Sequence, residues 1–307
     1  MFRSKISLIL MLTISNKCDI MEETMEPKLG KFPIEVFGRV YTDTSKEAQD
    51  GRNEQYCPYL CRECTKPRKS EPHIKVGICS VGYKGSFTNS YKPVIICPFR
   101  FLDDVVFKSI QDRFFPSWGN VKWVKEVNMG VSGNVDYVAV KIDEKTNEPV
   151  DFFCVEFQAN GTTGSPYGYV KDLLSKGKYG SNYTFGLNWA NEFMKTMMQQ
   201  VYKKGNVINT WGRKIVFVIQ DVAMDYLRSA VDTSDLRQKM DDPVHFMTFG
   251  EFWDEATSTY KLKPVEWLSA DLEGINKILA GANAQDYLTE SGFLSNAVKK
   301  GKADNVL

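Results

Sequence analysis

The chain has 307 residues, of which 43% are hydrophobic and 25% charged, so it can build one large globular domain or two smaller ones. Its net charge of +1 excludes general attraction to nucleic acid through overall charge, so any nucleic-acid surface must be local. Only two histidines occur, His73 and His245, which leaves almost no material for a histidine metal site or a Ser–His triad, and catalysis must depend on carboxylates, lysine or cysteine.

Residues 1–24 look like a leader or a mis-assigned start rather than part of the fold. Two basic residues precede the apolar run 6–14, an arrangement that resembles a weak signal peptide. The run is too short to span a bilayer, and no small-residue cleavage site follows it. We therefore expect residues 1–24 to be disordered and translation to begin at Met21 or Met25. A bacterial cytoplasmic protein without a membrane anchor is the expectation.

After this segment, strand patterns and helix patterns alternate along the chain. Strands are predicted over Ile34–Tyr41, Val76–Val81, Val94–Cys97, Trp118–Val127, Val135–Ile142, Val150–Gln158 and Lys214–Gln220, with a short strand and turn over Phe246–Phe252. Helices are predicted over Phe101–Phe114, Asn188–Lys203, Ala223–Ala230, Thr233–Met240 and Ser269–Ala280, the last capped by Ser269 and stopped by Gly281. This order predicts an α/β fold with a mixed sheet and helices on its faces.

Five of the seven cysteines lie near the front of the chain: Cys57, Cys61, Cys64, Cys79 and Cys97. Thiolates favour tetrahedral zinc or iron sites, and two ligands close in sequence can meet two others on separate strands. Four thiolates close the coordination sphere, so a metal held here is structural. The spacing differs from the double CxxC of zinc fingers, and free buried thiols or partial disulfides remain an alternative.

Basic residues surround these cysteines: Arg62, Lys66, Arg68, Lys69 and Lys75. Two prolines keep the segment extended, and a basic loop held by a metal suits contacts to phosphates or base edges. Glu63 and Glu71 balance part of this charge, so a solvated face is the simpler interpretation of these residues alone.

The hairpin predicted from Val135–Ile142 and Val150–Gln158 carries the strongest candidate site. The polar turn Asp143–Pro149 joins the two strands, and a fold-back there gives paired residue numbers that sum to about 293. This register sets Asp136 opposite the neighbourhood of Glu156.

Side chains repeat every two residues along a strand, so Gln158 shares the face of Glu156, and Glu126 on the preceding strand adds a third acid. Carboxylates held this close are unfavourable unless a cation lies between them, and Mg²⁺ is the natural cation for oxygen ligands. Acids on a solvated hairpin face are the alternative. Against it, apolar neighbours surround Glu156, and an acid in an apolar strand needs a partner.

The order of these motifs resembles the PD-(D/E)xK nucleases, with Gln158 where lysine is common, and more narrowly the NotI-type restriction endonucleases. The matching segments are Val36–Val40, Cys57–Leu60, Cys64, Gly77–Val81, Cys97–Arg100, Asp136, Glu156–Gln158 and the helix that holds Gln199 and Tyr202. The resemblance weakens after about residue 230.

The resemblance implies a homodimer that cuts both strands of double-stranded DNA at a long palindromic site with Mg²⁺. It implies an active site of Asp136, Glu156 and Gln158, with Glu126 as a loosely matched further acid. It also implies a structural iron in four cysteines. The implied iron ligands are Cys57, Cys64, Cys79 and Cys97, with Cys61 as an extra thiol that leaves the second ligand open and zinc as the other possible metal.

Residues 25–110 then form a metal-binding, DNA-contacting region and residues 111–307 the PD-(D/E)xK catalytic core. The expected DNA contacts are Arg62, Lys66, Arg68, Lys69 and Arg100. Two other functions fit parts of the pattern. One is a metal-clamped DNA-binding protein without catalysis, and the other is a secreted, disulfide-bonded protein.

Overall fold

The computed structural model describes residues 26–68, 70–180, 183–280 and 289–303. The predicted leader over 1–24, Lys69 and the predicted helix stop at Gly281 lie outside these ranges.

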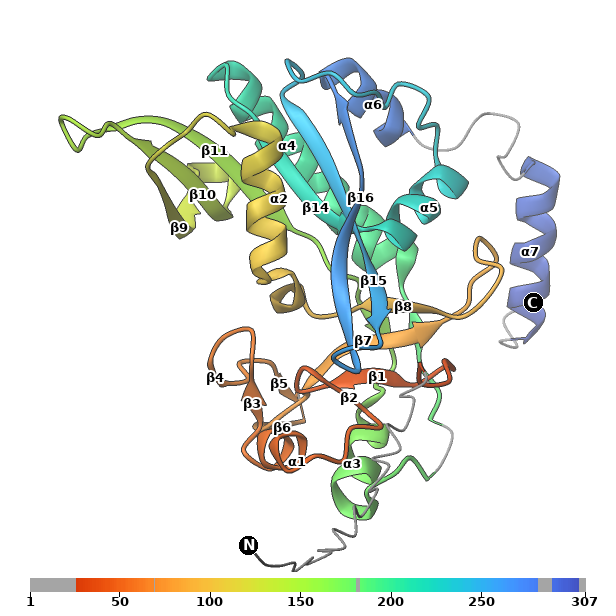
Figure 1. Ribbon diagram of the computed structural model, residues 1–307. Coiled ribbons are helices and arrows are strands. Elements are labelled where there is room, and N and C mark those ends of the chain that lie inside the picture. The colour runs from red at the N-terminus through yellow and green to blue at the C-terminus, as the bar shows by residue number, and fades with distance from the viewer. Residues whose placement is uncertain (1–25, 69, 181–182, 281–288, 304–307) are drawn as a thin grey trace, which may run out of the picture.

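A six-stranded mixed sheet forms the centre of the molecule, in the order β16-β15-β14-β11-β10-β9 (Figure 1). Its strands are β9 (Val121–Asn128), β10 (Asn134–Ile142), β11 (Pro149–Phe157), β14 (Ile215–Gln220), β15 (Val244–Asp254) and β16 (Thr259–Ala270). β11, β14 and β15 run parallel to one another, and the remaining pairs are antiparallel. The predicted α/β class and mixed sheet are confirmed. The strand predicted over Phe246–Phe252 is longer than expected, because β15 and β16 form one long hairpin.

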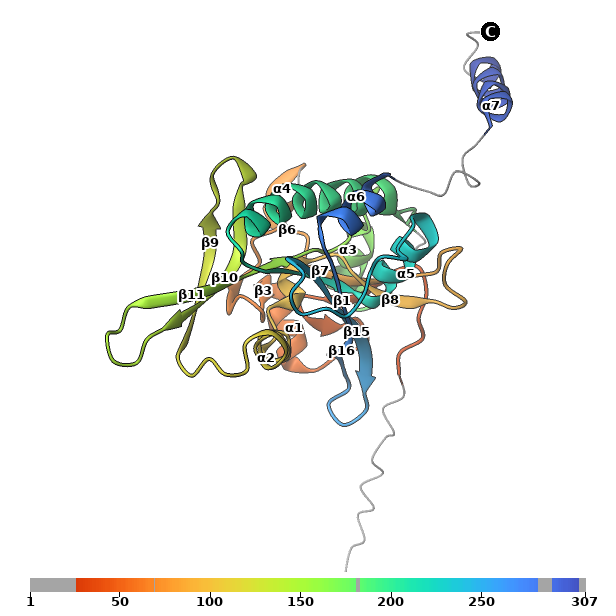
Figure 2. The same ribbon diagram turned by 90° about the horizontal axis from the view of Figure 1, so that it is seen from above.

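Helices cover both faces of this sheet, as the view from above shows (Figure 2). They are α2 (Asp104–Phe114), α4 (Thr196–Thr210), α5 (Asp221–Ala230) and α6 (Leu272–Ala280). The central strand β14 alternates between two apolar clusters: Ile215 and Phe217 pack on the side of α4, and Val216 and Val218 pack on the side of α2. Both faces of β14 are therefore buried, as its continuous apolar run predicts.

One helix prediction near the end of the sheet is wrong, and another is confirmed as α6 but begins three residues too early. Thr233–Met240 forms no helix, because Arg237 exchanges backbone hydrogen bonds with Ser269 on the edge strand β16. Ser269 is consequently a strand residue and not a helix cap. The cap of α6 is Asp271, whose Oδ1 accepts a hydrogen bond from the Gly274 amide at 2.9 Å.

A second, four-stranded sheet with the order β2-β1-β7-β8 lies below the first in Figure 1. Its strands are β1 (Pro33–Val36), β2 (Arg39–Val40), β7 (Ile78–Tyr83) and β8 (Lys92–Ile95). The turn between β1 and β2 has positive φ at Phe37 and Gly38, as a tight hairpin requires. A Cβ at Gly38 would also collide with the Pro58 ring.

Short elements complete the fold. They are α1 (Lys46–Asn53), α3 (Tyr167–Lys176), α7 (Glu290–Ala303), the paired strands β3 (Tyr56–Cys57) and β4 (Arg62–Glu63), β5 (Pro67–Arg68) and β6 (Glu71–Lys75), β12 (Thr162–Thr163) and β13 (Gly186–Leu187), and helical turns at Pro98–Phe101, Gly130–Ser132 and Trp189–Lys195. The turn at Trp189–Lys195 is π-helical and leads directly into α4.

The two sheets are joined by buried polar contacts. The Gln220 side chain, at the end of β14, accepts from the Ile95 amide and donates to the Pro93 carbonyl, both at 2.8 Å, so it pairs with β8 as a strand would. Arg100 donates through Nε to Glu35 at 2.9 Å and to Glu251 at 3.1 Å. These contacts fix the smaller sheet against the larger one and so define the space between them.

Candidate active site

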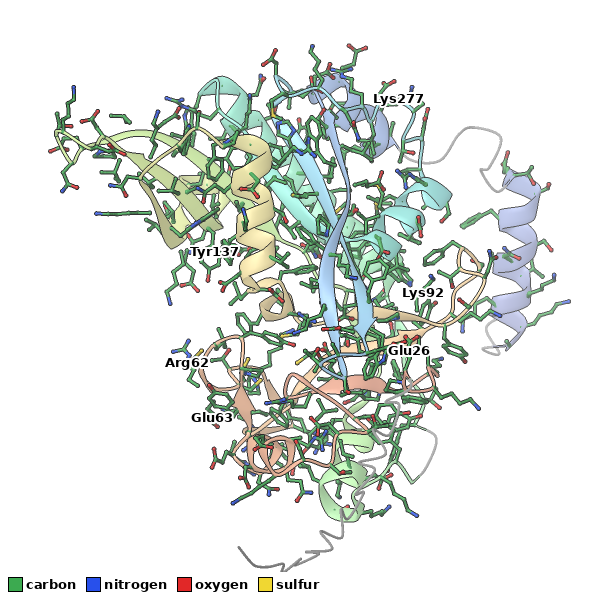
Figure 3. The ribbon with its side chains drawn as sticks, viewed as in Figure 1. Glu26, Arg62, Glu63, Lys92, Tyr137 and Lys277 are labelled. Atoms are coloured by element: carbon green, nitrogen blue, oxygen red, sulfur yellow. The ribbon has the colours of Figure 1, made fainter. Side chains whose placement is uncertain are left out.

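A cleft of about 690 Å³ opens between the two parts of the molecule. Its charged lining comprises Arg62, Lys125, Glu126, Asp136, Glu156 and Lys204. Figure 3 shows two of its walls: Arg62 extends from the smaller part and Tyr137 from β10, on the same side of the molecule. Residues of the cysteine-rich segment and the candidate acids therefore line the same cleft.

The strands bring three acids into one row across the sheet. The β10–β11 register pairs Tyr137 with Val155, so the predicted fold-back is correct to within one residue and Glu156 lies opposite Asp136. The β9–β10 register sets Glu126 on the other side of Asp136. Glu126 has φ +55°, a left-handed conformation that costs a non-glycine residue free energy and that recurs at functional sites.

Backbone amides orient Glu156, which is buried, and Asp136, which is half-buried. The Asp136 amide donates to Glu156 Oε1 at 3.2 Å, and the Phe157 amide donates to Asp136 Oδ2 at 2.8 Å. Within the described residues, no hydrogen bond reaches Asp136 Oδ1 or Glu156 Oε2. Each carboxylate therefore keeps one oxygen for a ligand. Paired carboxylate oxygens are the donors that Mg²⁺ prefers, so these residues fit that ion.

The sequence prediction missed a buried lysine at this site. Lys204 of α4 is 4% exposed, and its Nζ donates to Glu156 Oε1 at 2.5 Å and to the Asn134 carbonyl at 2.6 Å. The predicted helix stopped one residue short of it. The available signal was the spacing of Met197, Val201, Lys204 and Ile208, which places a lysine in the apolar stripe of the helix.

Burial shifts both acids toward their neutral forms. The pKa of Glu156 is raised to about 7 by desolvation and by the neighbouring Asp136 charge, and Lys204 opposes this shift. The pKa of Asp136 is raised by desolvation and by Glu126, against hydrogen bonding from Phe157 and the charge of Lys204. A cation between the two acids relieves both effects, because it favours their charged forms.

Three polar residues of the resemblance lie elsewhere. Gln158 follows the last residue of β11 and is half-buried, and its side chain donates to the Ala159 carbonyl at 3.3 Å. It is not part of the cleft lining, so its catalytic role stays a prediction. Gln199 and Tyr202 border a separate apolar cavity beside α6. The glutamine that does line the cleft is Gln200.

The predicted DNA contacts have different surroundings. Arg62 is exposed in the cleft, whereas Lys66 donates to a backbone carbonyl at 2.9 Å. Arg68 forms an ion pair and lies over a tyrosine ring at 4.8 Å. Arg100 is 2% exposed, and Glu35 and Glu251 bind its guanidinium, so it joins the sheets and is not available to a phosphate. This corrects its assignment as a DNA contact.

Four of the five front cysteines are buried, and Cys61 is exposed. Desolvation raises the pKa of Cys57, Cys79 and Cys97. The charges of neighbouring cysteines in this group, Cys64 among them, raise these pKa values further. Among the described residues, however, no three His, Cys, Asp or Glu side chains lie in a metal-holding arrangement. The structure therefore does not support the predicted four-cysteine metal site, although thiols are suitable donors for iron or zinc. The three acids of the cleft together form no such group among the described residues either, so a cation there would rest on Asp136 and Glu156.

The fold and the cleft define an α/β protein with a row of acids across three neighbouring strands of a mixed sheet, which is the arrangement that the resemblance implied for a nuclease. Residues 39–248 match the profile of the family described as restriction endonuclease NotI. This match covers well over half of the chain, and the chain belongs to that family. It is thus a site-specific deoxyribonuclease. A comparison with curated proteins finds no match. None of the described helices has the length and apolar character needed to cross a membrane.

Proposed function

We propose that this chain is a type II restriction endonuclease that makes double-strand breaks in DNA at a specific, long palindromic site by Mg²⁺-dependent phosphodiester hydrolysis. The observation that carries the proposal is the row of Glu126, Asp136 and Glu156 across β9, β10 and β11 in the cleft. Lys204 supplies one positive charge to this row of three carboxylates, so the row keeps a negative charge that a divalent cation would balance.

Asp136 and Glu156 would hold the Mg²⁺ through the oxygens that the sheet leaves without hydrogen bonds. The ion supplies positive charge that activates water and neutralises the reacting phosphate. Glu126 is the third acid, exposed at the cleft edge. Gln158 has no basic or cationic group, so its proposed role is to orient a water by hydrogen bonding.

The DNA backbone would follow the cleft past the cysteine-rich segment. Arg62 is exposed there, and Lys125 lies on the opposite wall next to the acid row. Lys66 and Arg68 extend the proposed basic surface on the same segment, and Lys69, which lies outside the described residues, is the further proposed contact from the sequence. Residues 25–110 would thus contribute DNA contacts and residues 111–307 the catalytic core.

A homodimer is proposed because one cleft cuts one strand. Two copies related by a two-fold axis present two clefts to the two strands of a palindrome. Sedimentation of the purified protein with and without DNA tests this arrangement, and a monomer on cleaved DNA would contradict it. The bacterial cytoplasm is the proposed location.

We also propose that Cys57, Cys64, Cys79 and Cys97 bind a structural iron or zinc. The support is that these four thiols are buried near one another, while Cys61 is exposed. The thiols would have to draw together on binding. Elemental analysis of the purified protein decides between iron, zinc and no metal.

The decisive experiment is digestion of a sequenced bacterial genome with Mg²⁺, followed by sequencing of the fragment ends. Fragments that share one palindromic sequence at their ends support the proposal. The competing function is a DNA-binding protein without catalysis. Retention of DNA without cleavage, under conditions where Mg²⁺ is present, would favour that function.

A further inference from the structure

We propose that Lys204, on helix α4, holds Glu156 in a single orientation and so supplies an ammonium group to the acid whose strand carries Gln158 in place of lysine. The strand motif carries Gln158 where lysine is common, yet a lysine from a distant part of the chain reaches the same acid. The proposal rests on the proposed function of this site.

The contacts of Lys204 define the kind of role it has. Its Nζ donates to Glu156 Oε1 at 2.5 Å, to the Asn134 carbonyl at 2.6 Å and to Gln200 Oε1 at 3.2 Å. An ammonium group has three N–H donors, so these three acceptors use all of them. Lys204 therefore has no donor left for a phosphate and acts through Glu156, which makes it a positioning residue.

The same contacts orient the Glu156 carboxylate. Oε1 receives hydrogen bonds from Lys204 and from the Asp136 amide, whereas no described residue donates to Oε2. Two donors on one oxygen hold the carboxylate plane and turn the other oxygen toward a ligand. A single donor would leave the carboxylate free to rotate.

The position of Lys204 in α4 indicates that its charge matters. Met197, Val201 and Ile208 are buried apolar residues of the same helix. An apolar residue at 204 would join them without the desolvation that a buried ammonium requires. The exposed Lys203, the next residue, supplies a matched control.

A first test needs no activity and uses the metal-free protein in chelator. Thermal melting is compared for wild type, Lys204→Met, Glu156→Gln and the double variant. Either single change leaves one buried group without its partner, so each should lower the melting temperature by about 5 °C or more. The double variant should melt well above the value that adding the two losses gives. Additive losses would show that the two side chains do not interact, and the inference would fail.

A second test measures single-turnover cleavage of bacterial genomic DNA with Mg²⁺, and DNA retention with Ca²⁺. Lys204→Met should slow cleavage by about a hundredfold, because a small misplacement of a reacting group costs that much. DNA retention should stay within about threefold of wild type, and Lys203→Met should leave both unchanged. Wild-type cleavage by Lys204→Met would overturn the inference while leaving the proposed function intact.

The sharpest test keeps the charge at position 204. Lys204→Arg retains a cation that can donate to Glu156 Oε1, and its cleavage should exceed that of Lys204→Met by about tenfold or more. A lysine that served only to pack α4 would gain nothing from the charge, so equal cleavage by the two variants would overturn the inference. If wild type itself does not cleave while the melting temperatures are coupled, the proposed function fails, and Lys204 holds Glu156 for some other purpose.

Discussion

Asp136 and Glu156 are held by each other's strands. The Asp136 amide lies 3.2 Å from Glu156 Oε1, and the amide that follows Glu156, that of Phe157, lies 2.8 Å from Asp136 Oδ2. These amides donate to carboxylates at the point where the regular β10–β11 pairing ends at Tyr137 and Val155. The same hydrogen bonds that end the strand pairing therefore hold the two carboxylates in place. The hairpin alone thus sets the positions of Asp136 and Glu156 relative to each other.

Removing either acid should abolish cleavage and leave DNA binding. Asp136→Asn and Glu156→Gln keep the size of the side chain but weaken cation binding, which contributes several kcal/mol to catalysis. The cleavage rate should fall on the order of a thousandfold. Gel retention without Mg²⁺ should be preserved. Glu148→Gln, at an exposed acid of the same hairpin, is the control and should cleave normally. Full activity of either active-site variant would remove the site assignment.

Arg100 should stabilise the fold and have no role in DNA binding. Arg100→Met leaves Glu35 and Glu251 buried without their cation, which should lower the free energy of unfolding by about 3–5 kcal/mol. Urea unfolding measures the loss, and Lys108→Met, in an exposed ion pair, should cost less than about 1 kcal/mol. The salt dependence of DNA binding should not change. A stable Arg100→Met protein with weakened DNA binding would restore the original assignment.

The hairpin could be predicted because its signals are local. Alternating apolar residues define both strands, the polar turn Asp143–Pro149 sets the register, and the register places Asp136 opposite Glu156. The helix Thr233–Met240 was wrong for the opposite reason. Its pattern is helical, but a long-range bridge from Arg237 to Ser269 determines the backbone there.

Lys204 shows why the rest of the site could not be predicted. Its partners are Glu156, separated by 48 positions, and the Asn134 carbonyl, separated by 70 positions. No spacing rule relates residues of a helix to a strand that it covers, so the contact follows only from tertiary packing. Gln158 was chosen by strand alternation, yet β11 ends before it and its side chain lies outside the cleft lining.

Cys64 and Cys61 should differ in their effect on bound metal. Cys64 is buried near the other thiols, whereas Cys61 is exposed and its Sγ lies 3.5 Å from the Pro58 carbonyl. If the proposed metal is bound, Cys64→Ser should therefore contain less iron or zinc than wild type by elemental analysis, and its melting temperature should fall by several degrees. Cys61→Ser should keep both. Loss of metal from Cys61→Ser with retention in Cys64→Ser would exchange the two assignments.

His245 should make stability depend on pH below neutrality. It is fully buried between aromatic rings, its Nδ1 accepts from Trp267, and desolvation lowers its pKa to about 4. In the unfolded chain it takes up a proton near pH 6.5, so its contribution is complete above that pH and is lost as pH falls toward 4. Between pH 7.5 and 5 the loss should be about 2 kcal/mol.

Urea unfolding of wild type and His245→Gln at both pH values isolates this contribution. The carboxylates are the same in both proteins, so their effect on the free energy of unfolding cancels in the comparison. The wild type should lose about 2 kcal/mol more than the variant between the two pH values. His73→Gln, at the exposed histidine, should follow the wild type. An equal pH dependence in wild type and His245→Gln would show that His245 is already charged, or already solvated, in the folded protein. In that case the contacts of Phe114 and Trp267 with the imidazole would not exclude water from His245.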